Sequence, residues 1–326
     1  MTKKAFTLVE IIVVIIVAGI LSVGTFIALK EIYLRSAKSK AISELSRNSE
    51  LTTSQVASLL YDRVPSSVIG YNTVSKNYQS IYEINNTYNV LEWIATARES
   101  FEHRDFSGFV DMNASNSLTD TLNSPDTNIS AISQTIQKKF DTTQNVYDND
   151  LVALVFAGSF DSGSLALTSD FNNSFGWHGG NSSLIYDINS SSSGNNIVLK
   201  SHPNEIYEKY YLVDTAYSLV RGEDLNRTIL ENNCGLDLSN ISNKSFKNTL
   251  FLFYNYRPWK SETFCGDPNI TGTETREGNV TVMATEVEGF RINLANSILQ
   301  FSLTLKRDIS SDKKHSVTIS KQKVIF

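Results

Sequence analysis

The chain has 326 residues, of which 41% are hydrophobic, and its formal net charge is −5 at pH 7. This length is enough for one large domain or two smaller ones, and the apolar content excludes disorder as the general state. The acidic balance argues against a nucleic-acid-binding surface as the main function, so we expect no direct nucleic-acid partner.

The N-terminal segment carries the strongest pattern in the sequence. An uncharged apolar run extends from Ile11 to Leu29, and as a helix it would span about 28 Å, close to the ~30 Å of a bilayer core. A secretory signal peptide has a shorter apolar region followed by a small-residue cleavage site, and no convincing site of that kind precedes Lys30. The run therefore predicts a membrane-spanning helix.

Glu10 is the one charge between Phe6 and Leu29. Inserting a carboxylate into a bilayer costs on the order of 2.5–3.5 kcal/mol of free energy. Glu10 is therefore a candidate functional residue, and its charge requires a partner that compensates this cost. The alternative is that Glu10 lies at the membrane interface, because it precedes the uncharged run.

The same helix is predicted to continue beyond the membrane. No proline occurs between Phe6 and Pro65, so we expect one helix with a membrane-spanning part at 6–29 and a continuation at 30–64. Small or apolar residues at helical spacing predict a packing stripe on the continuation. Its members are Leu34, Ala37, Ala41, Leu45, Thr52, Val56 and Leu59.

Residues 3–10, Lys-Lys-Ala-Phe-Thr-Leu-Val-Glu, with the apolar run after them, resemble the class III leader of type IV pilins and type II secretion pseudopilins. The resemblance implies that residues 1–5 are a leader peptide, which a prepilin peptidase removes by cutting between Ala5 and Phe6. The enzyme would then methylate the new Phe6 amine. The family usually has glycine before the cut, and this chain has Ala5 instead.

The resemblance also implies roles for residues of the helix. Glu10 matches the family glutamate that attracts the free N-terminus of a neighbouring subunit during filament assembly, which would supply its partner. Gly19 and Gly24 lie where pilin helices can unwind in filaments, and ordinary helix packing is an equal alternative. The implied partners are other pilin or pseudopilin subunits, the prepilin peptidase and an inner-membrane assembly platform. No cofactor is implied.

The basic residues and the family resemblance predict opposite orientations in the membrane. Lysines 3 and 4 precede the span and four basic residues follow it by position 40, so the positive-inside rule alone slightly favours a cytoplasmic C-terminal domain. The resemblance implies a single-pass protein of the bacterial inner membrane with its head, residues 65–326, in the periplasm or on an extracellular filament. We adopt the second orientation as the expectation.

The head is predicted to be α+β, with a C-terminal antiparallel sheet on which the long helix packs. Helices are expected at 90–103, capped by Asn89, and near 132–140. The Ser-, Asn- and Gly-rich stretch 189–196 is a candidate subdivision or hairpin loop. β-Branched and aromatic runs predict strands at 151–156, 197–200, 206–213, 216–220, 250–256, 280–285, 289–294, 299–306 and 316–326.

Three further matches, at 150–156, at 210–213 together with 219–221, and at 287–306, also look like parts of the larger minor pilins and minor pseudopilins, the W-type and J-type groups. A head of this size would crowd a helical array at every position but is tolerable at a filament tip. A minor subunit is therefore the expectation.

Cys234 and Cys265 are the only cysteines. In an exported protein, one disulfide closing a loop of about 30 residues would contribute ~3 kcal/mol. Two free buried thiols are the alternative, and the compartment decides between them.

No catalytic pattern of comparable strength occurs. The four histidines lie far apart, and the Walker A, G-x-G-x-x-G and G-x-S-x-G strings are missing from the sequence. Asp148, Asp150 and Asp161 lack the spacing of a calcium loop, so solvated turn carboxylates are favoured. We expect no metal site and no enzyme activity.

Two further patterns each leave alternatives open. The segments 177–180 and 254–259 are candidate aromatic contact surfaces on exposed loops, and core packing or loop ordering is the alternative for 254–259. Four Asp/Glu-x-Asn-x-Ser/Thr sequences resemble the acidic bacterial N-glycosylation sequon. They are either glycosylation sites or chance matches in an Asn- and Ser-rich chain. Their asparagines are Asn113, Asn128, Asn226 and Asn279.

The sequence thus supports three interpretations in descending order. The first is a minor pilin or minor pseudopilin, a non-enzymatic filament subunit. The second is a single-pass anchored receptor or adhesin outside any filament, which needs only the span and exposed aromatic loops. The third, a membrane-anchored enzyme, has no motif in its favour.

Overall fold

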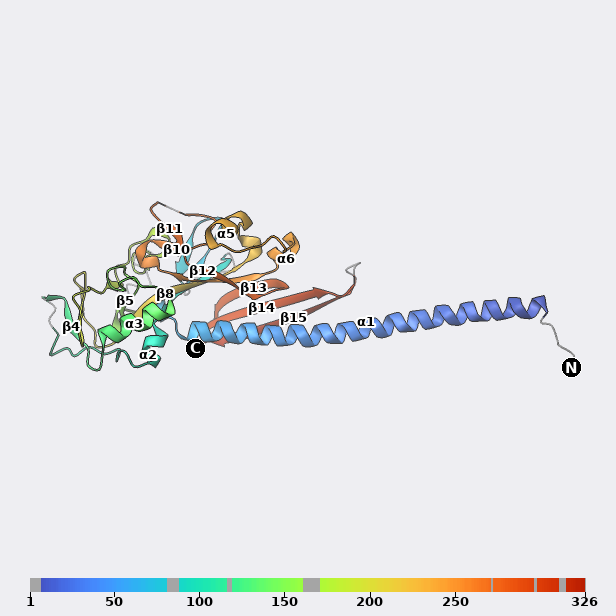
Figure 1. Cartoon of the computed structure of the whole chain (residues 1–326), viewed down its shortest axis with the longest axis horizontal. Helices are drawn as coiled ribbons and strands as arrows, with labels where there is room; N and C mark the ends of the chain where they lie inside the picture. The colour runs from blue at the N-terminus through green and yellow to red at the C-terminus, as the bar shows by residue number, and fades with distance from the viewer. Residues whose placement is uncertain are drawn as a thin grey trace.

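The computed structural model describes residues 7–80, 88–115, 119–160, 171–270, 272–295, 298–310 and 315–325. The chain is α+β. One long helix, α1 (Leu8–Tyr61), leads into a head built mainly from antiparallel sheets. The first part of α1 projects away from the head, and its second part lies along it (Figure 1).

The single long helix predicted from the sequence is confirmed. Thr7 caps its N-terminus, and the helix runs for 54 residues, or about 80 Å. It ends shortly before Pro65, whose ring favours extended backbone at the residue before it. Val64 is extended accordingly, and Pro65 begins the short 3-10 helix η1 (Pro65–Ser67).

The second half of α1 is buried against a three-stranded antiparallel sheet. The order of this sheet is β13 (Val287–Ala295), β14 (Ile298–Asp308) and β15 (Ser316–Ile325). The buried residues of the helix follow one stripe, and they include four members of the predicted stripe. They are Ala41, Leu45, Ser49, Thr52, Thr53, Val56 and Leu60.

A larger antiparallel sheet forms the centre of the head. Among the described residues its main path runs β12 (Asn279–Ala284), β9 (Leu250–Tyr256), β8 (Tyr210–Arg221), β3 (Val90–Thr96), β1 (Ile69–Tyr71) and β2 (Tyr78–Ser80). The strands β5 (Ala153–Phe156) and β6 (Tyr186–Asp187) lie off this path. β8 is the organising strand, because it pairs with β3, β5 and β9.

Smaller elements complete the head. β4 (Thr121–Asn123) pairs with β7 (Asn196–Val198), and β10 (Glu262–Phe264) pairs in parallel with β11 (Thr275–Glu277). The short helices are α2 (Arg98–Glu102), α3 (Ile129–Lys139), α5 (Arg227–Cys234) and α6 (Asn243–Lys247). The further 3-10 turns are η4 (Ala157–Phe160), η6 (Trp177–Gly179), η7 (Gly222–Asp224) and η8 (Pro258–Lys260).

The helix predicted over 90–103 is wrong. Residues Val90–Thr96 form β3, which is paired on both edges by β1 and β8, and only Arg98–Glu102 is helical. A strand buried on both faces reads as a continuous apolar run, and periodicity cannot separate such a run from a buried helix. Asn89 caps no helix; its side chain donates to Asp224 and accepts from the Thr73 amide.

The other predicted elements agree with the structure, with one simplification. The strands expected at 206–213 and 216–220 are the single strand β8. α3 covers the helix expected near 132–140, and the remaining predicted strands correspond to β5, β7, β9, β12, β13, β14 and β15. Residues 189–196 form a hairpin loop, closed by the bridge between Ile188 and Leu199. The subdivision at this point stays a prediction.

Candidate functional site

The first half of α1 is an exposed apolar surface. Every residue from Thr7 to Tyr33 is exposed, and the large apolar side chains from Leu8 to Leu29 are 47–74% accessible. In the described part of the chain, α1 is the one helix long and apolar enough to cross a membrane. Burying each such side chain is worth about 1.5–3 kcal/mol, so lipid or other protein is expected to cover this surface.

Glu10 closes a capping box at the start of this surface. The Thr7 amide and hydroxyl both donate to Glu10 Oε2 at 2.9 Å, and the Glu10 amide donates to Thr7 Oγ1 at 3.3 Å. This arrangement satisfies backbone donors that a helix N-terminus otherwise leaves unpaired. The carboxylate therefore has a structural partner within its own chain, Thr7, which was not among the predicted partners.

Four other residues of the N-terminal segment were predicted to have a role, and two of them lie outside the described residues. These two are Ala5 and Phe6, the predicted cleavage site. Gly19 and Gly24 are within α1, and a Cβ at either position would meet no atom within 4 Å. Packing within the described chain thus does not require glycine at either position.

The predicted disulfide is present. Cys234, the last residue of α5, is bonded to Cys265, which follows β10, with a Cα–Cα distance of 5.4 Å. Cys265 is buried in an apolar cluster with Phe253 and Phe264. The bond therefore ties a peripheral helix to the core of the head.

Ion pairs hold the second half of α1 on the small sheet. Arg307 of β14 pairs with Glu44 of the helix and with Glu286, which lies between β12 and β13. Lys321 of β15 pairs with Glu50 of the helix. These partly exposed contacts supplement the apolar stripe between the helix and the small sheet.

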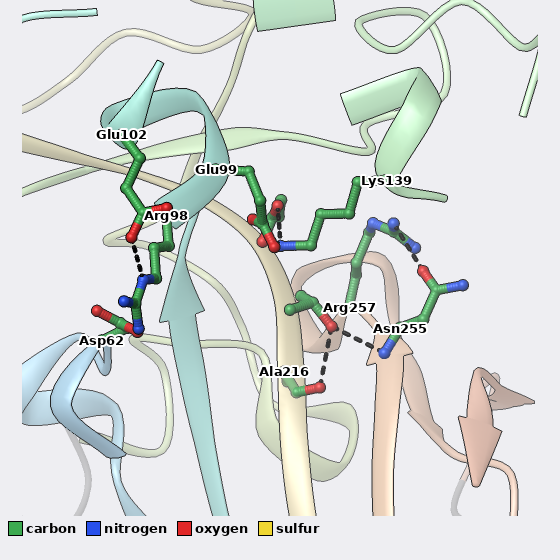
Figure 2. Close-up of polar contacts among 10 residues, drawn as sticks. Asp62, Arg98, Glu99, Glu102, Lys139, Ala216, Asn255 and Arg257 are labelled. Atoms are coloured by element: carbon green, nitrogen blue, oxygen red, sulfur yellow. Dashed lines mark hydrogen bonds and ion pairs between the residues drawn. The ribbon is translucent and has the colours of Figure 1, made fainter. Parts of the chain in front are cut away.

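A network of charged and polar side chains lies where α1 ends (Figure 2). Arg98 of α2 pairs with Asp62 and with Glu102, both at 2.7 Å. Beside it, Lys139 of α3 pairs with Glu99 and Asp214, again at 2.7 Å. The network thus joins the end of α1 to α2, α3 and β8.

The inner part of this network is buried. The Asp214 carboxylate is inaccessible, and Lys139 is 17% accessible. Burial opposes the Lys139 charge, but the two carboxylates outweigh it and raise the pKa of Lys139. Lys139 therefore stays charged as a structural counter-ion.

Arg257 lies close to this network (Figure 2). It stacks on the Phe140 ring at 4.8 Å and donates to Asn255 and to the Leu151 carbonyl.

A second buried polar cluster surrounds His178 in η6. Its Nε2 lies 2.9 Å from Glu92 Oε1, and its Nδ1 lies 3.7 Å from Asp267 Oδ2 and 4.0 Å from Glu274 Oε1. The imidazole stacks on Tyr71 with the ring centroids 3.8 Å apart. Burial opposes the charge, but the three carboxylates outweigh it and raise the pKa of His178.

The segments proposed as exposed aromatic loops contribute core side chains. Trp177 and His178 are buried, as are Tyr256 and Trp259. The exposed-loop alternative is thus wrong for these side chains, and core packing describes them.

Other predicted polar residues have structural roles. Asn128 and Asn226, two of the predicted glycosylation asparagines, cap α3 and α5. Asp150, one of the turn aspartates, pairs with Lys200. The described residues contain no group of three or more His, Cys, Asp or Glu placed to hold a metal ion.

A groove of about 490 Å³ opens at the end of α1, and we call it the end groove. Its walls come from the last turn of α1 with the residues after it, from α2, from the loop after α2 and from the start of β8. Aromatic and basic side chains dominate it, including Tyr61, Arg63, Arg98, Phe101, Phe109 and Lys209. Local sequence patterns do not reveal this site, because its residues come from segments that lie far apart in the chain.

The comparisons with known proteins add no relative. No model of a known protein family, no curated protein and no solved structure matches this chain. The structure itself defines an α+β protein with one candidate membrane-spanning helix near the N-terminus and a disulfide-bonded head.

Proposed function

We propose that this chain is a minor pilin or minor pseudopilin, a structural subunit assembled into or at the tip of a filament after prepilin peptidase processing. The supporting observation is the apolar first half of α1, which is exposed from Thr7 to Tyr33 and carries one acidic residue at its first turn. A helix of this kind is stable in a membrane before assembly and in a bundle of like helices afterwards.

Glu10 is the proposed assembly contact. Its Oε2 accepts both Thr7 hydrogen bonds, so the carboxylate is held at the helix start. Cleavage before Phe6 would create an amine one residue before Thr7. A staggered neighbour could then pair its own amine with this carboxylate in an apolar setting, where an isolated charge is costly.

A single-pass anchored receptor or adhesin is the second candidate. The capping box gives Glu10 a sufficient structural role without any neighbour, and the end groove provides a place for a ligand. This candidate predicts that the charge of Glu10 is dispensable so long as the cap is kept.

Glu10→Gln and Glu10→Ala separate the two candidates. Glutamine keeps a side-chain acceptor for the capping box but loses the charge, whereas alanine loses both. The filament proposal expects Glu10→Gln to abolish incorporation into filaments isolated from the producing cells, with the amount of membrane protein unchanged. Glu31→Gln, on the same exposed helix, is the matched control. Normal incorporation of Glu10→Gln would favour the adhesin.

A further inference from the structure

The end groove lies at the opposite end of α1 from the candidate membrane-spanning segment. Tyr61 and Asp62 form one wall where the helix finishes, and α2 lies beside that end of the helix in Figure 1. The 54 residues of α1 separate the groove from Leu8 by about 80 Å. A bilayer that holds the first half of the helix therefore lies far from the groove, which excludes that lipid surface as its occupant.

Three large rings on the groove wall are exposed to solvent. Tyr61 is 79% accessible, Phe101 59% and Phe109 46%. Their neighbours Phe106 and Tyr210 are buried beneath them. Rings of this type contribute most of the binding energy at recognition sites when a partner covers them.

The groove is held in shape by the contacts around it. Arg98 is fixed between Asp62 and Glu102, and the Tyr210 hydroxyl lies 2.7 Å from Ser124 Oγ. Beside the Arg98 contacts, the Lys139 network ties α2 to β8 (Figure 2). A site that is formed before binding does not lose affinity to ordering of its walls.

The charge of the lining is locally positive on an acidic protein. Arg63, Arg98 and Lys209 line the groove together with one carboxylate, Asp62, whereas the whole chain carries −5. Arg98 is neutralised by its two carboxylates. Lys209 lies over the Phe109 ring at 5.7 Å and forms no ion pair with a described carboxylate. A ligand that suits this wall brings an anion to Lys209 and an apolar group to the rings.

We propose that the end groove binds an acidic peptide segment of a partner protein, in which a carboxylate lies next to an aromatic side chain. Single-stranded nucleic acid fits less well. It requires a track of cations along the backbone, and here one of the three lining cations, Arg98, is already paired with two carboxylates. The proposal concerns the head and does not depend on filament assembly.

Binding of short peptides to the full chain in detergent micelles tests this proposal. The probes are acetyl-Glu-Phe-Glu-Phe-amide, its lysine counterpart acetyl-Lys-Phe-Lys-Phe-amide, and an oligothymidylate of eight nucleotides, each followed by calorimetric titration. The variants are Lys209→Glu and Phe109→Ala, two exposed positions whose replacement leaves the core intact. Lys247→Glu, an exposed lysine outside the groove, is the matched charge-reversal control.

The acidic peptide is expected to bind and the lysine peptide to bind much more weakly. Lys209→Glu should weaken binding of the acidic peptide by about tenfold or more, Phe109→Ala should also weaken it, and Lys247→Glu should leave it unchanged. The proposal is overturned if the wild-type chain does not bind the acidic peptide, or if both charge reversals have equal effects. Tighter binding of oligothymidylate than of the peptide would assign the groove to nucleic acid instead.

Discussion

Lys139 Nζ lies 2.7 Å from Asp214 Oδ2, and this carboxylate is inaccessible to solvent at the centre of the head. The lysine comes from the last residue of α3 and the aspartate from β8. Glu99 of α2 reaches the same ammonium at 2.7 Å, so three elements meet at one charge. The pair therefore fixes how the α2–α3 region is mounted on the large sheet.

Replacing Lys139 by methionine should cost about 3–5 kcal/mol of unfolding free energy, because it leaves the Asp214 carboxylate buried without its counter-ion. Urea unfolding followed by tryptophan fluorescence measures this cost, since Trp93, Trp177 and Trp259 are all buried in the head. Lys138→Met, at the exposed neighbouring position, should change the free energy by less than about 0.5 kcal/mol. Equal losses in the two variants would contradict the counter-ion role.

Leu45→Ala should release the second half of α1 from the head. Leu45 is fully buried in the stripe that packs on the small sheet, and truncation of a buried leucine costs about 2–5 kcal/mol. Amide hydrogen exchange along residues 41–60 should become faster, while exchange in β3 and β8 stays slow. Ile42→Ala, next to a buried position but itself 41% accessible, is the control. An unchanged exchange pattern in Leu45→Ala would show that the stripe does not hold the helix.

Removal of the Cys234–Cys265 disulfide should lower the unfolding free energy by about 3–4 kcal/mol, as the chain-entropy relation gives for a separation of 31 residues. The double variant Cys234→Ala/Cys265→Ala and the reduced wild-type chain should unfold at similar urea concentrations. The oxidised wild-type chain should unfold at a clearly higher one. Coincident curves for the oxidised and reduced chains would contradict a stabilising role.

The cluster around His178 predicts that stability falls as pH rises. Burial raises the pKa of Asp267 to about 6, against about 3.9 in an unfolded chain. The folded state therefore holds this proton more tightly, so the contribution to stability is fully present below pH 4 and is lost as pH rises through 6. The raised pKa of His178 has the same sign, since it favours the folded state below about pH 6.5.

The unfolding free energy should thus decrease between pH 5 and pH 7.5, and Asp267→Asn should flatten this decrease. Burial also raises the pKa of Asp187 to about 6. Part of the decrease of the unfolding free energy with pH should therefore remain in that variant. Asp148→Asn, at an exposed turn, should keep the wild-type slope. Urea unfolding at four pH values measures all three proteins. A slope in Asp267→Asn identical to that of the wild type would refute the assignment.

Local sequence patterns predicted most of the fold. An unbroken helical segment before Pro65 and a periodic stripe were sufficient for α1, and β-branched runs between turn residues were sufficient for β9, β12 and β14. Residues 90–103 were mispredicted because Val90–Thr96 is buried on both faces, so its apolar residues show no alternation. Only the pairing with β1 and β8, which depends on residues far away in sequence, makes this segment a strand.

Among the candidate sites, too, those with a local sequence signal were predicted and those built from distant residues were not. Glu10 and the two cysteines were found from the sequence, because a charge in an apolar run and a single cysteine pair are local signals. The end groove and the Lys139 and His178 clusters were missed, since their members are separated by tens to hundreds of residues. Asp214, for example, is 75 residues from Lys139. A buried ion pair of this kind leaves no trace in local hydropathy.

Intact-mass analysis of the membrane protein tests the central proposal most directly. If the chain is a pilin-like subunit, protein from cells with a working prepilin peptidase should lack Met1 to Ala5 and begin with a methylated Phe6. A catalytically inactive peptidase in the same cells should restore the full-length mass. An intact N-terminus at Met1 in the presence of the active peptidase would contradict the proposed function.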